Sequence, residues 1–197
     1  MGSGTAFAVV TGGGTAGHVL PALAVADALV ASGHEPASIH YVGTTRGVET
    51  TLVPPTGYPC TLLDVVGLQR RLTSRNVTFL PRLVRATTQA TRLLRALRPR
   101  VVVNVGGYAS FPATWAARRL GIPYVVVSYD RRPGLVSRLL APRAAACASA
   151  FGAACRMEPA RLPCVARRCR WRRRSHRTRQ QSRGLDRRTD MAPIRES

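Results

Sequence analysis

Along the first 150 residues, short apolar runs alternate with longer stretches in which apolar residues recur every three or four positions. Runs with the length of buried strands lie at 6–11, 38–42, 61–66, 101–105 and 124–128. Stretches with a helical pattern or composition lie at 20–32, 47–53, 76–98, 113–120 and 134–150. This alternation predicts an α/β domain with a Rossmann-like parallel sheet and helices on both faces.

The pattern stops near residues 151–155, and the character of the chain changes there. The net charge of the whole chain is +21, every basic residue is Arg, and Arg is crowded from Arg167 to Arg179. We therefore predict a domain at 1–154 and a disordered, Arg-rich tail at 155–197. A Lys-free chain indicates a GC-rich gene, and such a tail is typical of out-of-frame translation. The alternative is a genuine basic arm that binds nucleic acid through counterion release.

Several other classes of protein are disfavoured by composition. No apolar run is long enough to span a membrane, and the N-terminus does not have the pattern of a secretory signal. The five cysteines are odd in number, which argues against a disulfide framework. Cys164, Cys169 and His176 do not have the spacing of a zinc module. We therefore expect neither a metal nor another cofactor.

The first predicted strand is followed directly by a glycine-rich loop with Gly12, Gly13, Gly14 and Gly17. Glycine allows close approach of a ligand, and the N-terminus of the following helix offers free N–H groups, so the loop predicts diphosphate binding. A tight turn without a ligand is the alternative.

The same glycines match the dinucleotide fingerprint G-x-G-x-x-G, but residues 41–46 lack the acidic residue that NAD binding requires. Arg46 leaves an NADP-binding protein as an alternative. A Walker A loop is excluded, because the chain has no Lys.

A second glycine loop, at 106–110, also follows a predicted strand and precedes a predicted helix. The carboxyl ends of the strands in a doubly wound sheet face one crevice, so both loops are expected to lie there. A site that binds a dinucleotide through the first glycine loop does not need a second glycine loop. The pair therefore favours an elongated ligand that contains a diphosphate.

Three motifs point to a family. GGGTAGHVLPALAVADAL at 12–29, GGYASFPA at 106–113 and PGLVSRLLA at 133–141 resemble the MurG family, and the resemblance covers residues 5–151. It implies a GT-B glycosyltransferase, of which this chain carries the N-terminal, acceptor-binding domain. The reaction implied transfers N-acetylglucosamine from UDP-GlcNAc to undecaprenyl-diphosphate-linked N-acetylmuramyl-pentapeptide, from lipid I to lipid II. It serves peptidoglycan synthesis, and through it cell shape and cell division.

The resemblance also implies roles for individual residues. His18 is the candidate catalytic residue, and it would accept a proton from the attacking sugar hydroxyl. The donor nucleotide would contact Thr15, Ala16 and Gly17. The acceptor would be held and oriented by Gly13, Gly14, Gly106, Gly107, Tyr108 and Ser110.

One position departs from the family pattern. Where the family carries His-Glu-Gln-Asn, this chain has Val127-Ser128-Tyr129-Asp130. Asp130 therefore stands at a position that contacts the donor. An ionised Asp accepts hydrogen bonds but cannot donate them, and it would repel a diphosphate.

The resemblance implies a peripheral protein on the cytoplasmic face of the cell membrane. Residues 68–100 carry nine Arg among Leu, Val and Phe79, which suits an anionic membrane surface. An ordinary helix with a core face and a solvated Arg face is the alternative. Because the resemblance fades after Phe151, we expect a truncated or frameshifted copy with little activity alone.

Overall fold

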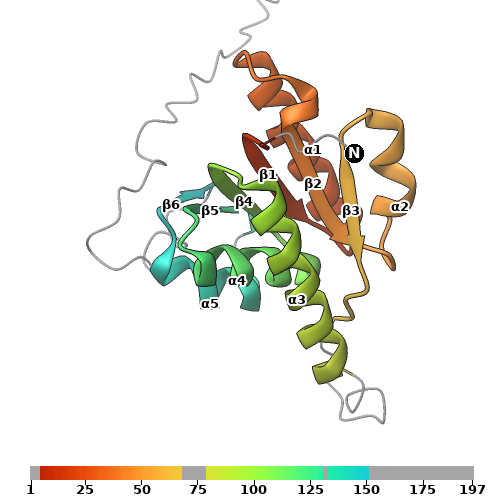
Figure 1. Ribbon diagram of the computed structural model, residues 1–197, viewed down its shortest axis with the longest axis vertical. Helices are drawn as coiled ribbons and strands as arrows, with labels where there is room; N and C mark the ends of the chain where they lie inside the picture. The colour runs from red at the N-terminus through yellow and green to blue at the C-terminus, as the bar shows by residue number, and fades with distance from the viewer. Residues whose placement is uncertain (1–4, 68–78, 131–132, 151–197) are drawn as a thin grey trace, which may run out of the picture.

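The computed structural model describes residues 5–67, 79–130 and 133–150 (Figure 1). Strands and helices alternate in this order: β1 (Ala8–Gly12), α1 (Ala16–Ala31), β2 (Ile39–Thr44), α2 (Glu49–Leu52), β3 (Cys60–Leu63), α3 (Phe79–Leu97), β4 (Val101–Gly106), α4 (Phe111–Leu120), β5 (Tyr124–Ser128), α5 (Leu135–Leu140) and β6 (Ala146–Ser149). Short 3₁₀ turns lie at 36–38, 54–56, 108–110 and 141–143. The predicted Arg-rich tail lies outside the described residues, and the predicted boundary at 154 stays a prediction.

The strands form one parallel sheet in the order β3-β2-β1-β4-β5-β6, which is the strand order of a Rossmann fold. The predicted Rossmann-like α/β class is therefore confirmed. Strand order reverses between β1 and β4, and ligands bind doubly wound sheets at this switch point. The glycine loops after β1 and β4 are the two loops that flank it.

Helices cover both faces of the sheet, as predicted (Figure 1). One core lies between the sheet and α3, α4 and α5, where α3 contributes Ala86, Ala90 and Leu94. The other core lies between the sheet and α1, where Val19, Ala22 and Ala26 are buried. The small alanines let α3 and α1 approach the Val-rich strands closely. Among the described residues, no helix is long and apolar enough to cross a membrane.

The prediction of helix throughout 134–150 was wrong. Helix α5 ends at Leu140, and residues 146–149 form strand β6, which pairs with β5 from Val125↔Ala146 to Ser128↔Ser149. The segment Ala-Cys-Ala-Ser lacks the β-branched and aromatic residues that mark a strand. Its conformation is set by hydrogen bonds to β5, which a local sequence pattern does not contain.

Helix α1 begins at Ala16, four residues before the predicted start at Leu20. The sequence between Thr15 and Val19 was assigned to the glycine turn, but it forms the first turn of the helix. Two consequences follow for the site. His18 is held on a helix, and Pro21 lies inside the helix beyond its first turn. Since proline has no N–H, the carbonyl of Gly17 loses its helical partner.

Candidate functional site

The two glycine loops touch each other at the switch point. Gly12 and Gly106 are partners in the register of β1 and β4. Gly107 has φ +80° and ψ 159°, a conformation that is almost restricted to glycine. A Cβ added to Gly107 would overlap the carbonyl oxygen of Gly13. Gly107 is therefore required both for its backbone conformation and for the contact between the loops.

Tyr108 packs its ring on the first loop. Gly14 has φ +93°, and a Cβ there would overlap the ring of Tyr108. Burial, and then the charge of Glu49, raise the pKa of the Tyr108 hydroxyl. Ser110 is buried, and its hydroxyl donates to the carbonyl of Gly107 at 2.8 Å. The structure thus gives Ser110 a partner within the second loop.

A buried carboxylate lies under the first loop, and the sequence analysis missed it. Glu49, the first residue of α2, has no solvent exposure. Its Oε1 accepts from the N–H of Gly14 at 3.1 Å and from the N–H of Thr44 at 2.8 Å. Its Oε2 accepts from the N–H of Gly14 at 3.2 Å. The one sequence feature that could have indicated Glu49 was its place, as an acidic residue, at the start of a helix just beyond β2.

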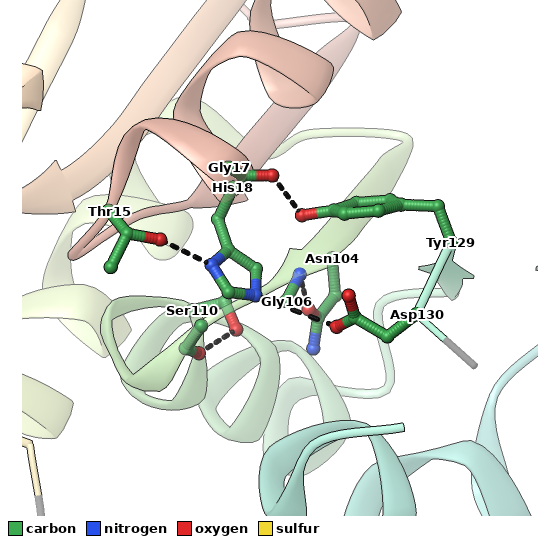
Figure 2. Close-up of polar contacts among 9 residues, drawn as sticks. Thr15, Gly17, His18, Asn104, Gly106, Ser110, Tyr129 and Asp130 are labelled. Carbon is green, nitrogen blue, oxygen red and sulfur yellow. Dashed lines mark hydrogen bonds and ion pairs between the residues drawn. The ribbon is translucent and has the colours of Figure 1, made fainter. Parts of the chain in front are cut away.

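His18 lies in the first turn of α1, beside the second loop (Figure 2). Its Nδ1 and the hydroxyl of Thr15 share a hydrogen bond of 2.9 Å. Its Nε2 lies 3.9 Å from Oδ2 of Asp130, which is within ion-pair range but too long for a hydrogen bond. The ring packs on Gly106, where a Cβ would come 3.0 Å from the imidazole. The structure therefore brings His18 and Asp130 together.

Tyr129 supplies the partner that Pro21 removes. Its hydroxyl donates a short hydrogen bond to the carbonyl of Gly17, four residues before Pro21 (Figure 2). Burial, and then the charge of Asp130, raise the pKa of Tyr129 to about 12. The hydroxyl thus keeps its proton at neutral pH and ties the segment after β5 to α1. This contact was also missed, because it joins segments 112 residues apart.

A largely apolar cavity of about 620 Å³ opens beside these groups. Polar or charged groups at its wall belong to His18, Tyr108, Ser128, Ser137 and Asp130. Most of the remaining wall is apolar and comes from the segment after β3, from α3, from α4 and from α5. Gly106 and Gly107 also line it. A long apolar ligand with a polar group at the glycine loops fits this distribution.

The structure places the candidate residues in three different surroundings. Thr15, Ala16 and Gly17 are exposed at the start of α1, outside the cavity wall. His18, Gly106, Gly107, Tyr108 and Asp130 line the cavity. Gly13 is buried, and the N–H of Gly14 is bonded to Glu49. Gly13 and Gly14 therefore shape the first loop, and Gly14 does not present a free N–H.

The strand order and the paired glycine loops at the switch point define a Rossmann-like α/β domain with a ligand-binding crevice at the carboxyl ends of its strands. Residues 8–149 match the glycosyltransferase family 28 N-terminal domain, and the chain belongs to this family. This match does not support the nucleic-acid-binding and NADP-binding alternatives. Arg46, which the NADP alternative invoked, pairs with Asp64 at 2.8 Å.

Named relatives agree with this assignment. The chain is 42% identical over 145 residues to the UDP-N-acetylglucosamine–N-acetylmuramyl-(pentapeptide) pyrophosphoryl-undecaprenol N-acetylglucosamine transferase of Pseudomonas entomophila, covering 73% of this chain and 39% of that protein. The Desulforudis audaxviator protein of the same name is 39% identical, and the match covers 78% of this chain and 41% of that protein. The crystal structure of Acinetobacter baumannii MurG superimposes on this chain with a TM-score of 0.63 at 30% identity. The match covers 73% of this chain and 41% of that protein. The chain thus spans about 40% of the length of these relatives.

Proposed function

We propose that this chain is the acceptor-binding part of an N-acetylglucosaminyltransferase that uses UDP-GlcNAc and a lipid-linked diphosphate acceptor. The observation that carries the proposal is the placement of His18. It lies where two touching glycine loops meet an apolar cavity of about 620 Å³. The names of the relatives supply the identity of the sugar and of the undecaprenyl-diphosphate muramyl-pentapeptide acceptor. Conversion of lipid I to lipid II would serve peptidoglycan synthesis.

His18 is the proposed general base. For its Nε2 to accept the proton of a sugar hydroxyl, Nδ1 must carry a proton and donate it to the oxygen of Thr15, 2.9 Å away. The imidazolium formed in this step would then face the carboxylate of Asp130 at 3.9 Å. Opposite charges at this distance attract, so Asp130 would stabilise the charged ring. No cofactor or metal is invoked.

The remaining glycine-loop and α1 candidates take three proposed roles. Gly106, Gly107 and Tyr108, which line the cavity, would contact the acceptor diphosphate. Thr15, Ala16 and Gly17, which are exposed, would contact a donor that approaches from outside the cavity. Gly13, Gly14 and Ser110 act by shaping the two loops. Asp130 would disfavour a diphosphate beside it, because it carries the same charge.

The test is transfer of radiolabelled N-acetylglucosamine from UDP-GlcNAc to a short-chain lipid I analogue. Residues 1–149 of this chain would replace the matching part of the Pseudomonas entomophila relative. We expect this chimera to transfer sugar, and His18→Ala to lower the rate about 100-fold or more. The control is His34→Ala, at the far end of α1. Equal rates in the His18→Ala and parent chimeras would contradict the role of His18.

The chain by itself is expected to bind the acceptor analogue but to transfer little sugar. A GT-B reaction takes place between two domains, and a single domain leaves the donor open to water. Rapid transfer by the purified 197-residue chain would contradict this expectation.

We further propose that the protein works peripherally on the cytoplasmic face of the membrane. Leu80 and Val84 on α3 and Leu135 and Leu139 on α5 are exposed large apolar residues. The helices that carry them both line the apolar cavity. Helix α3 also carries Arg82, Arg85, Arg92 and Arg95, whose charge would attract anionic lipid headgroups.

Co-sedimentation with anionic vesicles at low salt tests the membrane surface. Leu80→Ser combined with Val84→Ser should weaken sedimentation of the full chain, because apolar area that enters the lipid is lost. Leu20→Ser removes an equally exposed leucine from α1, on the opposite face of the sheet, and should have no effect. Identical sedimentation of the double variant and the parent chain would refute this membrane surface.

A further inference from the structure

Glu49 is a fully buried acid in the part of the fold that carries the site. Among the described residues, no Arg or His forms an ion pair with it. Its oxygens instead accept from the backbone N–H groups of Gly14 and Thr44. A buried carboxylate is costly unless hydrogen bonds compensate for its lost hydration, so these contacts hold Glu49 in place.

The chain keeps space around Glu49 by placing glycine on three sides. A Cβ added at Gly13 or Gly47 would collide with the Glu49 side chain, and one at Gly43 would come 3.0 Å from it. These glycines belong to the first loop, to the end of β2 and to the turn before α2. One carboxylate therefore packs between three backbone segments and bonds to two of them.

The hydroxyl of Tyr41 extends this arrangement. Tyr41, on β2, donates to the carbonyl of Gly12 at 2.5 Å, and its pKa is raised by burial and then by the charge of Glu49. The first loop is thus held at Gly12 by a phenol and at Gly14 by a carboxylate. Tyr108 of the second loop packs on Gly14, so the position of Gly14 also sets that of the cavity wall.

We propose that Glu49 is a positioning residue, which locks the first glycine loop in the conformation that the diphosphate ligand requires. The N–H of Gly14 donates to the carboxylate of Glu49. The ligand anion therefore binds without a hydrogen bond from the N–H of Gly14. Glu49 lies beneath the loop, does not line the cavity and does not touch the ligand. The identity of the ligand rests on the function proposed above, whereas the locking of the loop does not.

The test uses the full chain, with Glu49→Gln and Glu49→Ala as variants. Gln keeps the shape and the oxygen that accepts from both Thr44 and Gly14, whereas Ala removes every contact. Glu35→Gln and Glu35→Ala are the matched controls, because Glu35 is exposed and lies before β2. Farnesyl diphosphate is the binding probe, measured by calorimetry. The amide signals of Gly14 and Thr44, measured by ¹⁵N NMR, report the loop without any ligand.

Glu49→Ala should weaken binding of farnesyl diphosphate by about tenfold to a hundredfold, since a misplacement of about 1 Å costs this much at a preorganised site. Glu49→Gln should recover most of the affinity. The Gly14 and Thr44 amides should shift in both variants, and neither change should occur in the controls. A merely structural role would lower the melting temperature of Glu49→Ala and leave the affinity of its folded fraction unchanged.

The proposal is overturned if the folded Glu49→Ala chain binds farnesyl diphosphate as tightly as the parent, or if its Gly14 amide keeps the parent signal. If Glu49→Ala does not fold, Glu49→Gln decides: an unshifted Gly14 amide then overturns the proposal. If the parent chain does not bind the probe, the proposed function fails at that point. The amide signals still decide whether Glu49 holds the loop, so the two failures are distinguishable.

Discussion

Replacing Gly107 by Ala tests whether the contact between the two glycine loops holds the site together. The backbone of Gly107, at φ +80° and ψ 159°, costs a residue with a Cβ about 1–3 kcal/mol. The new Cβ would also overlap the carbonyl oxygen of Gly13 and lie 3.2 Å from its carbonyl carbon and nitrogen. These neighbours are backbone atoms, so no side chain can rotate away. Overpacking adds about 1–3 kcal/mol, so we expect a total loss of about 2–6 kcal/mol.

Urea denaturation followed by circular dichroism would measure this loss. The matched control is Gly121→Ala, because Gly121 has φ +70° but no atom within 4 Å of a new Cβ. Gly121→Ala should lower the free energy of unfolding by about 1–2 kcal/mol, because only the left-handed backbone conformation is unfavourable for Ala there. Gly107→Ala should also abolish binding of farnesyl diphosphate, since the loops must separate. The reasoning would be refuted by a Gly107→Ala chain that loses no more stability than Gly121→Ala.

Further predictions concern single contacts elsewhere. Tyr129→Phe removes the hydrogen bond to Gly17 and should lower the free energy of unfolding by about 1 kcal/mol in urea titrations; no change would show that water replaces the phenol. Burial lowers the pKa of His40 below its usual 6.5, so the unfolded chain takes up a proton first as the pH falls. Stability contributed by neutral His40 is therefore complete above pH 6.5 and is lost as the pH falls toward the folded pKa, and His40→Gln should flatten this part of the pH profile. Leu94→Ala, at a 1% exposed position on the core-facing side of α3, should cost about 2–5 kcal/mol by calorimetry, and a smaller cost would mean that the core collapses around the gap.

Local patterns were sufficient for elements whose own side chains specify them. Strand β5 was predicted at 124–128 and lies there, because Tyr-Val-Val-Val combines β-branched and aromatic residues. Helix α4 ends at Leu120 as predicted, since the next residue is Gly121, whose φ of +70° suits glycine. Strand β6 was missed, because Ala-Cys-Ala-Ser becomes a strand only through its hydrogen bonds to β5.

The candidate site shows the same division between local and distant information. The glycine loops were found from sequence, since phosphate-type loops need glycine at fixed spacing directly after a strand. His18 was found through the resemblance to a known family. The side chains that hydrogen-bond to the backbone of Gly14 and Gly17 were not found from sequence. Glu49 lies 35 residues from Gly14, and Tyr129 lies 112 residues from Gly17.

The sequence by itself determined the alternation of strands and helices, the two glycine loops after β1 and β4, and the resemblance to a glycosyltransferase family. These features depend on periodicity, on backbone freedom and on motifs, all of which are local. The tertiary structure decided that a buried carboxylate occupies the Gly14 N–H, that Asp130 faces His18, and that the two loops touch. Each of these depends on which strands are neighbours in the sheet, and that order arises only when the whole core is packed.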